Sequence, residues 1–92
     1  MMDATADSSE RYTLYQYDSC PFCYRVRRFL DDACIQIETR DVLRDPAARK
    51  ALLEGGGRTT VPCLRIERRG ETLWLYESLD IIDYLRRRFE AS

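Results

Sequence analysis

The sequence of 92 residues contains no histidine, and this absence excludes several classes of enzyme. Cysteine–histidine proteases, hydrolases with histidine-bound zinc and most mechanisms with a histidine general base all need an imidazole ring. The sequence also has no apolar run that approaches the roughly 20 residues of a membrane span. Its N-terminus lacks the basic and then apolar pattern of a signal peptide. We therefore predict a cytoplasmic protein that is not embedded in a membrane.

Net charge is low as well, because 15 basic and 16 acidic residues leave a formal charge of -1 at pH 7. This balance argues against a nucleic-acid partner. Arginines do cluster locally, at Arg25, Arg27 and Arg28 and again at 86–88. Such clusters are usually solvated helix faces, although the first could also help to hold an anionic sulfur or an acidic substrate.

The length of the chain suits one domain with a modest hydrophobic core. The segment from Met1 to Glu10 is small, polar and acidic, with nothing to bury, so we predict a disordered N-terminal tail over residues 1–10. Residues 11–92 are predicted to form the single domain, which we expect to be a monomer.

The reactive groups are concentrated in Cys20-Pro21-Phe22-Cys23, where a strand-like segment from residue 12 to 17 gives way to helical periodicity. With Cys20 as the N-cap, Pro21 takes the first helical position, where its missing amide proton costs nothing. Unpaired N–H groups and the helix dipole favour an anion at the N-cap. We therefore predict that Cys20 is a thiolate nucleophile with an exposed sulfur, and that the more buried Cys23 resolves its mixed disulfides. The apolar face of this helix is predicted to contain Phe22, Val26, Phe29, Leu30 and Ala33.

A Cys-X-X-Cys pair could instead be half of a structural zinc site, which needs four ligands. The chain has no histidine, and Cys34 and Cys63 are isolated in apolar runs. A redox role is therefore favoured over zinc, and no metal site is predicted. Cys34 and Cys63 are both predicted to be small buried hydrophobic residues.

The remaining segments predict three further strands and two further helices. A strand is expected over residues 35–42, followed by a helix that Asp45 caps and that Gly55 to Gly57 end. Those glycines are not read as a phosphate loop, because the required lysine and hydroxyl residue do not follow. Residues 63–67 and 72–76 are predicted to form an antiparallel hairpin. Ser78 is predicted to cap the last helix, whose Ile82, Leu85 and Phe89 face the core.

The predicted order is therefore β-α-β-α-β-β-α, which defines an α/β fold. Two strands joined through a helix form a parallel pair, and the hairpin adds two strands on one side. We expect a four-stranded mixed sheet flanked by three helices. Periodicity gives no reason to expect a cis bond before Pro62, because only about one X-Pro bond in twenty is cis.

The combination of Cys20-Pro21-Phe22-Cys23 with Gly57-Arg58-Thr59-Thr60-Val61-Pro62 resembles the bacterial dithiol glutaredoxins. The resemblance extends from Arg11 to Phe89. It implies a thioredoxin-like fold and an oxidoreductase that uses glutathione as co-substrate to reduce protein–glutathione mixed disulfides and protein disulfides. Its expected partners are glutathione and such protein substrates.

The resemblance also implies which residues contact glutathione. It places a cis bond at Val61-Pro62, with the Val61 backbone pairing with the cysteinyl part of glutathione like an added strand and Thr60 beside it. Phe22 belongs to the same expected contact set. The γ-glutamyl end should reach Glu77-Ser78, whose free N–H groups could receive its carboxylate.

Two departures from the glutaredoxin pattern affect this assignment. Tyr76-Glu77-Ser78 resembles the Glu-Ser of glutathione transferase N-terminal domains rather than the glycine pair and aspartate common in glutaredoxins. Tyr17 occupies the position of a lysine that often contacts the glycyl carboxylate, so Arg58 is the candidate for that contact; an ordinary solvated arginine is an equally good interpretation.

Two other functions stay open on sequence grounds. Cys20 from two subunits, with two glutathiones, could hold a [2Fe-2S] cluster, although Pro21 and the second cysteine resemble the redox type more. Anaerobic reconstitution separates these functions, since the carrier would form a stable brown dimer. A glutathione transferase is the third possibility, but the 92 residues leave no room for a helical second domain, so we expect no conjugating activity.

Overall fold

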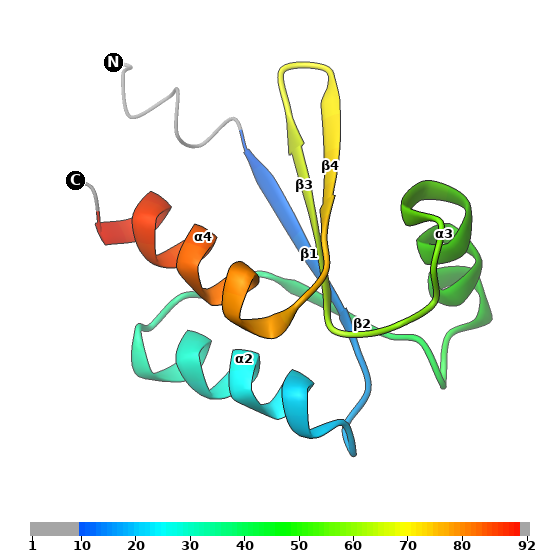
Figure 1. Cartoon of the computed structure of the whole chain (residues 1–92), viewed down its shortest axis with the longest axis horizontal. Helices are drawn as coiled ribbons and strands as arrows, with labels where there is room; N and C mark the ends of the chain where they lie inside the picture. Colours follow the sequence, from blue (N-terminus) through cyan, green and yellow to red (C-terminus); the bar gives the residue numbers. More distant parts are fainter. Residues whose placement is uncertain (1–9, 91–92) are drawn as a thin grey trace.

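The computed structural model describes residues 10–90, in which seven elements follow one another in the predicted order (Figure 1). The strands form one sheet in the order β2-β1-β3-β4. Strand β1 pairs in parallel with β2 and antiparallel with β3, and β3 pairs antiparallel with β4. The predicted mixed sheet with three helices is therefore confirmed. The elements are β1 (Arg11–Gln16), α2 (Pro21–Asp32), β2 (Glu38–Asp41), α3 (Pro46–Gly56), β3 (Cys63–Arg68), β4 (Glu71–Leu75) and α4 (Ser78–Glu90).

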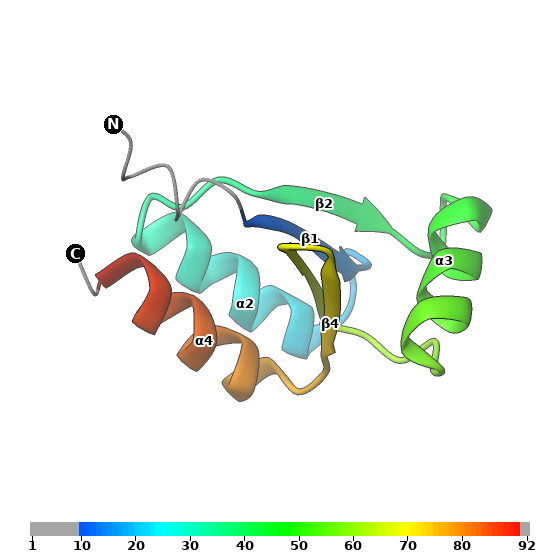
Figure 2. The same ribbon diagram turned by 90° about the horizontal axis from the view of Figure 1, so that it is seen from above.

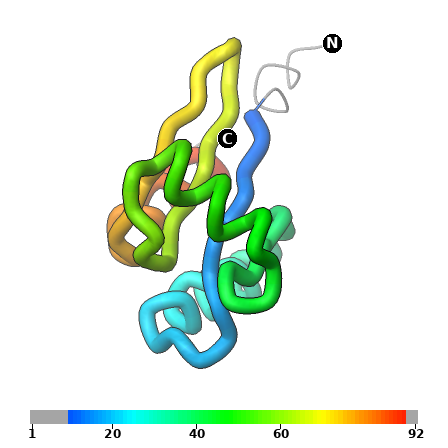
Figure 3. The backbone as a smooth tube through the Cα atoms, turned by 90° about the vertical axis from the view of Figure 1, so that its right-hand side faces the viewer, coloured from blue at the N-terminus to red at the C-terminus, as the bar shows by residue number. Residues whose placement is uncertain are grey.

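The sheet separates two layers of helix (Figure 2). Helices α2 and α4 lie side by side on one face, and α3 covers the other, where it lies in front of the strands in Figure 3. Side chains alternate along each strand, so Leu14 and Leu64 face α2 and α4, while Tyr15 and Cys63 face α3. The sheet therefore has a hydrophobic core on each side.

Local capping signals set the start of the first two helices. Cys20 is the N-cap of α2 and Pro21 follows it at the first position, as predicted. Asp45 caps α3, and its carboxylate accepts hydrogen bonds from the backbone N–H groups of Ala47 and Ala48. None of the helices within residues 10–90 is both long enough and apolar enough to span a membrane.

The glycines at the end of α3 have two different roles. Gly57 ends the helix in a left-handed conformation with a φ of 90°, as a helix-stop requires. Gly55 and Gly56 belong to the helix, and they allow close packing instead. A Cβ on Gly55 would lie 2.1 Å from the ring of Trp74, and one on Gly56 would lie 2.1 Å from the Tyr76 hydroxyl.

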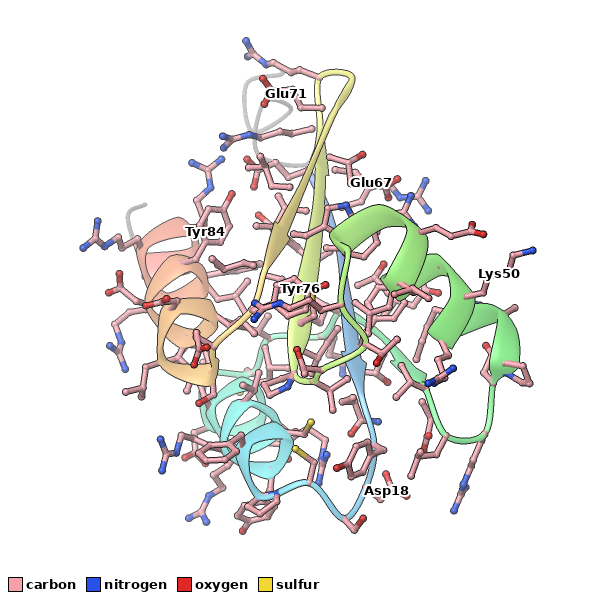
Figure 4. The ribbon with its side chains drawn as sticks, turned by 45° about the vertical axis from the view of Figure 1, so that its right-hand side comes forward. Asp18, Lys50, Glu67, Glu71, Tyr76 and Tyr84 are labelled. Atoms are coloured by element: carbon pink, nitrogen blue, oxygen red, sulfur yellow. The ribbon has the colours of Figure 1, made fainter. Side chains whose placement is uncertain are left out.

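Glu10 does not belong to a disordered tail, so this part of the prediction is wrong; residues 1–9 lie outside the described residues. The side chain of Glu10 is only 3% exposed. Arg88 donates to both of its carboxylate oxygens, at 2.6 and 3.2 Å, and Arg68 donates at 3.4 Å. The hydroxyls of Tyr12 and Tyr84 donate to the same carboxylate. Tyr84 is labelled in Figure 4, at the end of the sheet that lies away from Asp18.

Three smaller predictions also need correction. Cys34 is exposed rather than buried, because it follows the end of α2 in a left-handed conformation with a φ of 57°. Phe89 is 44% exposed, whereas Ile81 takes a core position that the sequence pattern did not indicate. Helix α4 includes Ser78 as its first residue, and the carbonyl of Glu77 accepts the first helical hydrogen bond, from Ile81. The cap therefore lies one residue earlier than predicted.

Candidate active site

Cys20 lies at the N-terminus of α2, just beyond the end of β1. Its Sγ accepts a hydrogen bond from the Cys23 backbone N–H at 3.3 Å, which is the predicted N-cap interaction. The same sulfur lies 3.9 Å from the carbonyl oxygen of Val61. Cys20 is only 4% exposed, so the expectation of an openly exposed sulfur is wrong. A reacting molecule can therefore reach this sulfur only through the small part of its surface that is accessible.

Cys23 lies one turn further along α2 and is completely buried. Burial raises the pKa of the Cys23 thiol well above its ordinary value, and its hydrogen bond with Cys20 acts in the same direction. Cys23 is therefore a protonated thiol near neutral pH. Cys20, whose sulfur takes the N-cap position at the helix start, is therefore the better placed of the two to act as the nucleophile.

The turn that presents Cys20 is held by Arg27. Its guanidinium donates to the side-chain carbonyl of Gln16, at the end of β1, and to the backbone carbonyl of Asp18 at 3.2 Å. The backbone N–H of Cys20 also bonds to the carbonyl of Tyr17 at 3.2 Å. Arg27 is therefore a structural residue of the turn rather than a free surface charge.

A groove of about 380 Å³ lies beside these residues, between the start of α2 and the start of α4. The bond between Val61 and Pro62 is cis, as the family resemblance implied, and both residues line the groove. Phe22 also lines it and is 55% exposed, so it does not belong to the core face of α2 as the helical periodicity predicted. The full lining is Phe22, Arg25, Thr60, Val61, Pro62, Tyr76, Glu77, Ser78, Leu79 and Asp80.

The groove thus contains six of the seven residues predicted to contact glutathione, and Arg58 is the exception. The Arg58 guanidinium stacks on the ring of Tyr76, 4.2 Å from its centroid, and the Tyr76 hydroxyl donates to the Arg58 carbonyl at 3.0 Å. Tyr76, which Figure 4 labels, does line the groove, so Arg58 contacts a lining residue without lining the groove itself. The contact predicted for Arg58 stays a prediction.

Three residues of the groove were not singled out from the sequence: Tyr76, Leu79 and Asp80 belong to the segment around Glu77-Ser78. Arg25 was noted only as one of three clustered arginines. Sequence spacing alone could not separate it from Arg27, which holds the turn, or from Arg28, which pairs with Asp32 at 3.5 Å.

Within residues 10–90, no group of three or more cysteine or acidic residues has the arrangement of a metal site. Cys63 lies on the α3 side of the sheet and is completely buried, as predicted. Burial raises the pKa of its thiol to about 12. None of the four cysteines is among the residues that line the groove, and Cys20 is linked to it through Val61, whose carbonyl oxygen lies 3.9 Å from the Cys20 Sγ.

Comparison with solved structures places this fold in a known class. The thioredoxin-like protein BC3987 is 27% identical and superimposes with a TM-score of 0.62, covering 82% of this chain and 99% of that protein. Glutathione transferase Omega 1C from Trametes versicolor superimposes with a TM-score of 0.71, covering 88% of this chain and 38% of that protein, but at 22% identity it supports the fold alone. The fold and the paired cysteines at the start of α2 define a thioredoxin-like protein.

Within that class, residues 12–70 match the family model for glutaredoxin, and the chain belongs to the glutaredoxin family. It is 28% identical over 54 residues to Glutaredoxin 3 of Escherichia coli K12, a match that covers 59% of this chain and 65% of that protein. Maleylacetoacetate isomerase from Anaeromyxobacter dehalogenans, solved with GSH bound in its active site, is 30% identical with a TM-score of 0.66. That match covers 87% of this chain but only 38% of the isomerase.

Proposed function

We propose that this protein is a glutathione-dependent thiol–disulfide oxidoreductase that acts through Cys20 and Cys23. The observation that carries the proposal is the position of the Cys20 sulfur, which accepts the Cys23 N–H at a helix start and lies beside the backbone of Val61 in the groove wall. Membership of the glutaredoxin family and the GSH bound to the similar isomerase support the choice of glutathione as co-substrate.

Reduction of a protein–glutathione mixed disulfide takes two exchange steps. The Cys20 thiolate attacks the glutathionyl sulfur, so a Cys20–glutathione disulfide forms, the old disulfide breaks, and the protein leaves as a thiolate that takes up a proton. A second glutathione thiolate then attacks the glutathionyl sulfur on Cys20, which releases oxidised glutathione and restores the Cys20 thiolate. Glutaredoxin disulfides have potentials of about −200 to −230 mV, which suit exchange with the glutathione pool.

A protein disulfide requires Cys23 as well. Attack by Cys20 links it to one substrate sulfur and releases the other as a thiolate. Cys23 then loses its proton and attacks Cys20, which frees the substrate and leaves a Cys20–Cys23 disulfide for two glutathione molecules to reduce. The raised pKa of the Cys23 thiol keeps it protonated until this step.

The groove offers a complementary surface to glutathione. We assign the cysteinyl part to the backbone of Val61, with Thr60 beside it and Phe22 in the same groove. The γ-glutamyl end then reaches the start of α4 at Glu77 and Ser78, where free N–H groups can receive a carboxylate. Because Cys20 is nearly buried, substrates approach along this groove rather than across an open surface.

The test is a steady-state assay with a glutathionylated peptide, reduced glutathione and glutathione reductase. We expect Cys20→Ser to abolish turnover, whereas Cys23→Ser keeps turnover on this substrate and loses it on a protein disulfide. Cys34→Ser is the matched control and should behave as the unmodified protein does. Full activity in Cys20→Ser would contradict the assignment of the nucleophile.

A further inference from the structure

The groove beside Cys20 has an uneven distribution of charge. Arg25, on α2, is the only cationic residue among those that line it, whereas Glu77 and Asp80, at the start of α4, contribute carboxylates. Cationic and anionic residues therefore come from different elements that border the same cavity. A ligand that carries one charge of each sign on neighbouring atoms would match this arrangement.

Arg25 is available for such a ligand in a way that its neighbours are not. Its guanidinium lies 5.7 Å from the centroid of the Phe22 ring, which keeps the side chain along the groove wall. None of the ion pairs formed within residues 10–90 includes Arg25. Arg27 and Arg28, by contrast, are occupied by the turn before Cys20 and by Asp32.

The two ends of glutathione differ in the charges that they present. The γ-glutamyl end has an α-carboxylate and an α-ammonium on one carbon, whereas the glycyl end has a carboxylate alone. With the cysteinyl sulfur at Cys20, the end directed toward α4 lies in the groove that Arg25 lines from α2 and that Glu77 and Asp80 line at the start of α4. Only the γ-glutamyl end supplies a partner for both.

We propose that Arg25 binds the α-carboxylate of the γ-glutamyl group and thereby selects γ-glutamyl thiols over other small thiols. This inference rests on the proposed function and identifies the side chain that determines its substrate preference. The Arg25 guanidinium donates a charge-assisted hydrogen bond to this carboxylate from α2. The backbone N–H groups at the start of α4 donate to the same carboxylate from the other element. Arg25 does not touch the reacting sulfurs, so its contribution is to binding rather than to the exchange step.

The test measures one exchange step with three substrates. The reduced Cys23→Ser protein is mixed with a fluorescent peptide disulfide-linked to glutathione, to γ-glutamylcysteine or to cysteinylglycine, and the second-order rate constant for peptide release is recorded. Because cysteinylglycine lacks the γ-glutamyl group, it reports on all features of the site except the proposed contact. The variants are Arg25→Gln, Arg25→Lys and, as a control on the same helix, Arg28→Gln.

We expect Arg25→Gln to lower the rate constant about tenfold for the glutathione and γ-glutamylcysteine disulfides, which corresponds to the loss of one charge-assisted contact. The cysteinylglycine disulfide should change by less than about twofold, and Arg28→Gln should change none of the three by more than that. Arg25→Lys should recover part of the loss, since it restores the charge without the planar fork.

An equal loss on all three substrates, or no loss on any, would overturn the assignment of Arg25. A Cys23→Ser protein with Arg25 intact that releases peptide from none of the three disulfides would contradict the proposed function itself, and the inference with it. The two failures are therefore distinguishable within one set of measurements.

Discussion

A polar group lies next to each end of strand β1, and the two groups differ in how many donors from the protein surround them. Glu10, just before the strand, is enclosed by two arginines and two tyrosines that donate to its carboxylate. Cys20, just after the strand, receives one backbone N–H and lies next to Val61, which lines a groove of about 380 Å³. The two ends appear in Figure 4 near Tyr84 and near Asp18.

This difference separates a structural polar cluster from a binding site. At the Glu10 end, the donors come from β1, β3 and α4, so the protein's own side chains satisfy the buried charge and tie these elements together. At the Cys20 end, the starts of two helices border a cavity that is also lined by Arg25, which forms no ion pair within residues 10–90. The first end should therefore contribute to stability and the second to ligand binding, and the following predictions test that division.

The largest effect on stability is expected from Glu10→Ala. Removing the buried carboxylate leaves Arg68, Arg88 and two tyrosine hydroxyls without their acceptor, and we expect a loss of about 3 kcal/mol in the free energy of unfolding. Turnover at a temperature where the variant is folded should not change. Urea denaturation and the glutathione-coupled assay measure the two quantities.

Glu54→Ala provides the control for that experiment, because Glu54 is 65% exposed and its nearest cation, Lys50, is 4.0 Å away. Its cost should stay below about 0.5 kcal/mol. If Glu10→Ala were no more destabilising than Glu54→Ala, or if it reduced turnover selectively, the division between the two ends would be wrong.

Lowering the pH should reduce the free energy of unfolding by a smaller amount. Burial alone raises the pKa of the Glu10 carboxyl, but hydrogen bonds from Tyr12 and Arg68 and the charge of Arg88 outweigh it, so its pKa lies below the ordinary value. A lowered pKa in the folded state stabilises the protein above the ordinary pKa of glutamate, and this stability is lost as the pH falls through the folded pKa. Denaturation midpoints should therefore decrease between about pH 5 and pH 3.

Glu10→Gln tests the origin of that decrease, because it removes the titrating group and keeps much of the shape. Its stability should depend less on pH over the same range than that of the unmodified protein. Identical pH profiles for the two proteins would assign the acid sensitivity to other carboxylates.

Thiol reactivity distinguishes the two cysteines outside the Cys20–Cys23 pair. Cys34 is exposed, whereas Cys63 is completely buried and its thiol has a pKa raised to about 12. Iodoacetamide at neutral pH should alkylate Cys34 in the folded protein and leave Cys63 unmodified until denaturant is added. Peptide mass spectrometry gives the extent of labelling at each site. Equal labelling of both residues in the folded protein would show that the α3 side of the sheet is open.

The smallest effect is expected from Cys34→Gly, which should raise the free energy of unfolding by about 0.5 kcal/mol. Glycine relieves the cost of a left-handed conformation, about 1–2 kcal/mol, and loses part of that gain through the greater freedom of the unfolded chain. Cys34→Ser keeps the same backbone cost and should be neutral. A destabilised Cys34→Gly would mean that the side chain contributes more than its exposure indicates.

Short-range patterns predicted the elements that border the site. Cys20-Pro21 and Asp45-Pro46 marked two helix starts, and Gly57 marked a helix end, because each acts on the backbone within a few residues. The cysteine pair and the family resemblance then identified most of the groove.

The missed features depend on contacts between distant parts of the chain. We predicted Glu10 to be part of a polar tail because its partners, Arg68 and Arg88, are far from it in the sequence. Gly55 and Gly56 were predicted to end the helix, although their role is to let the side chains of Trp74 and Tyr76 pack against the helix backbone. Such roles follow from packing, which local composition does not specify.

The most direct test of Cys20 as the nucleophile is to locate glutathione on the protein. The Cys23→Ser protein, in a Cys34→Ser background to remove the exposed thiol, is treated with oxidised glutathione and analysed by intact mass and peptide mass spectrometry. We predict one glutathionyl group, on Cys20, that reduced glutathione removes. A protein that stays unmodified at Cys20, or that carries the group on Cys63 instead, would contradict it.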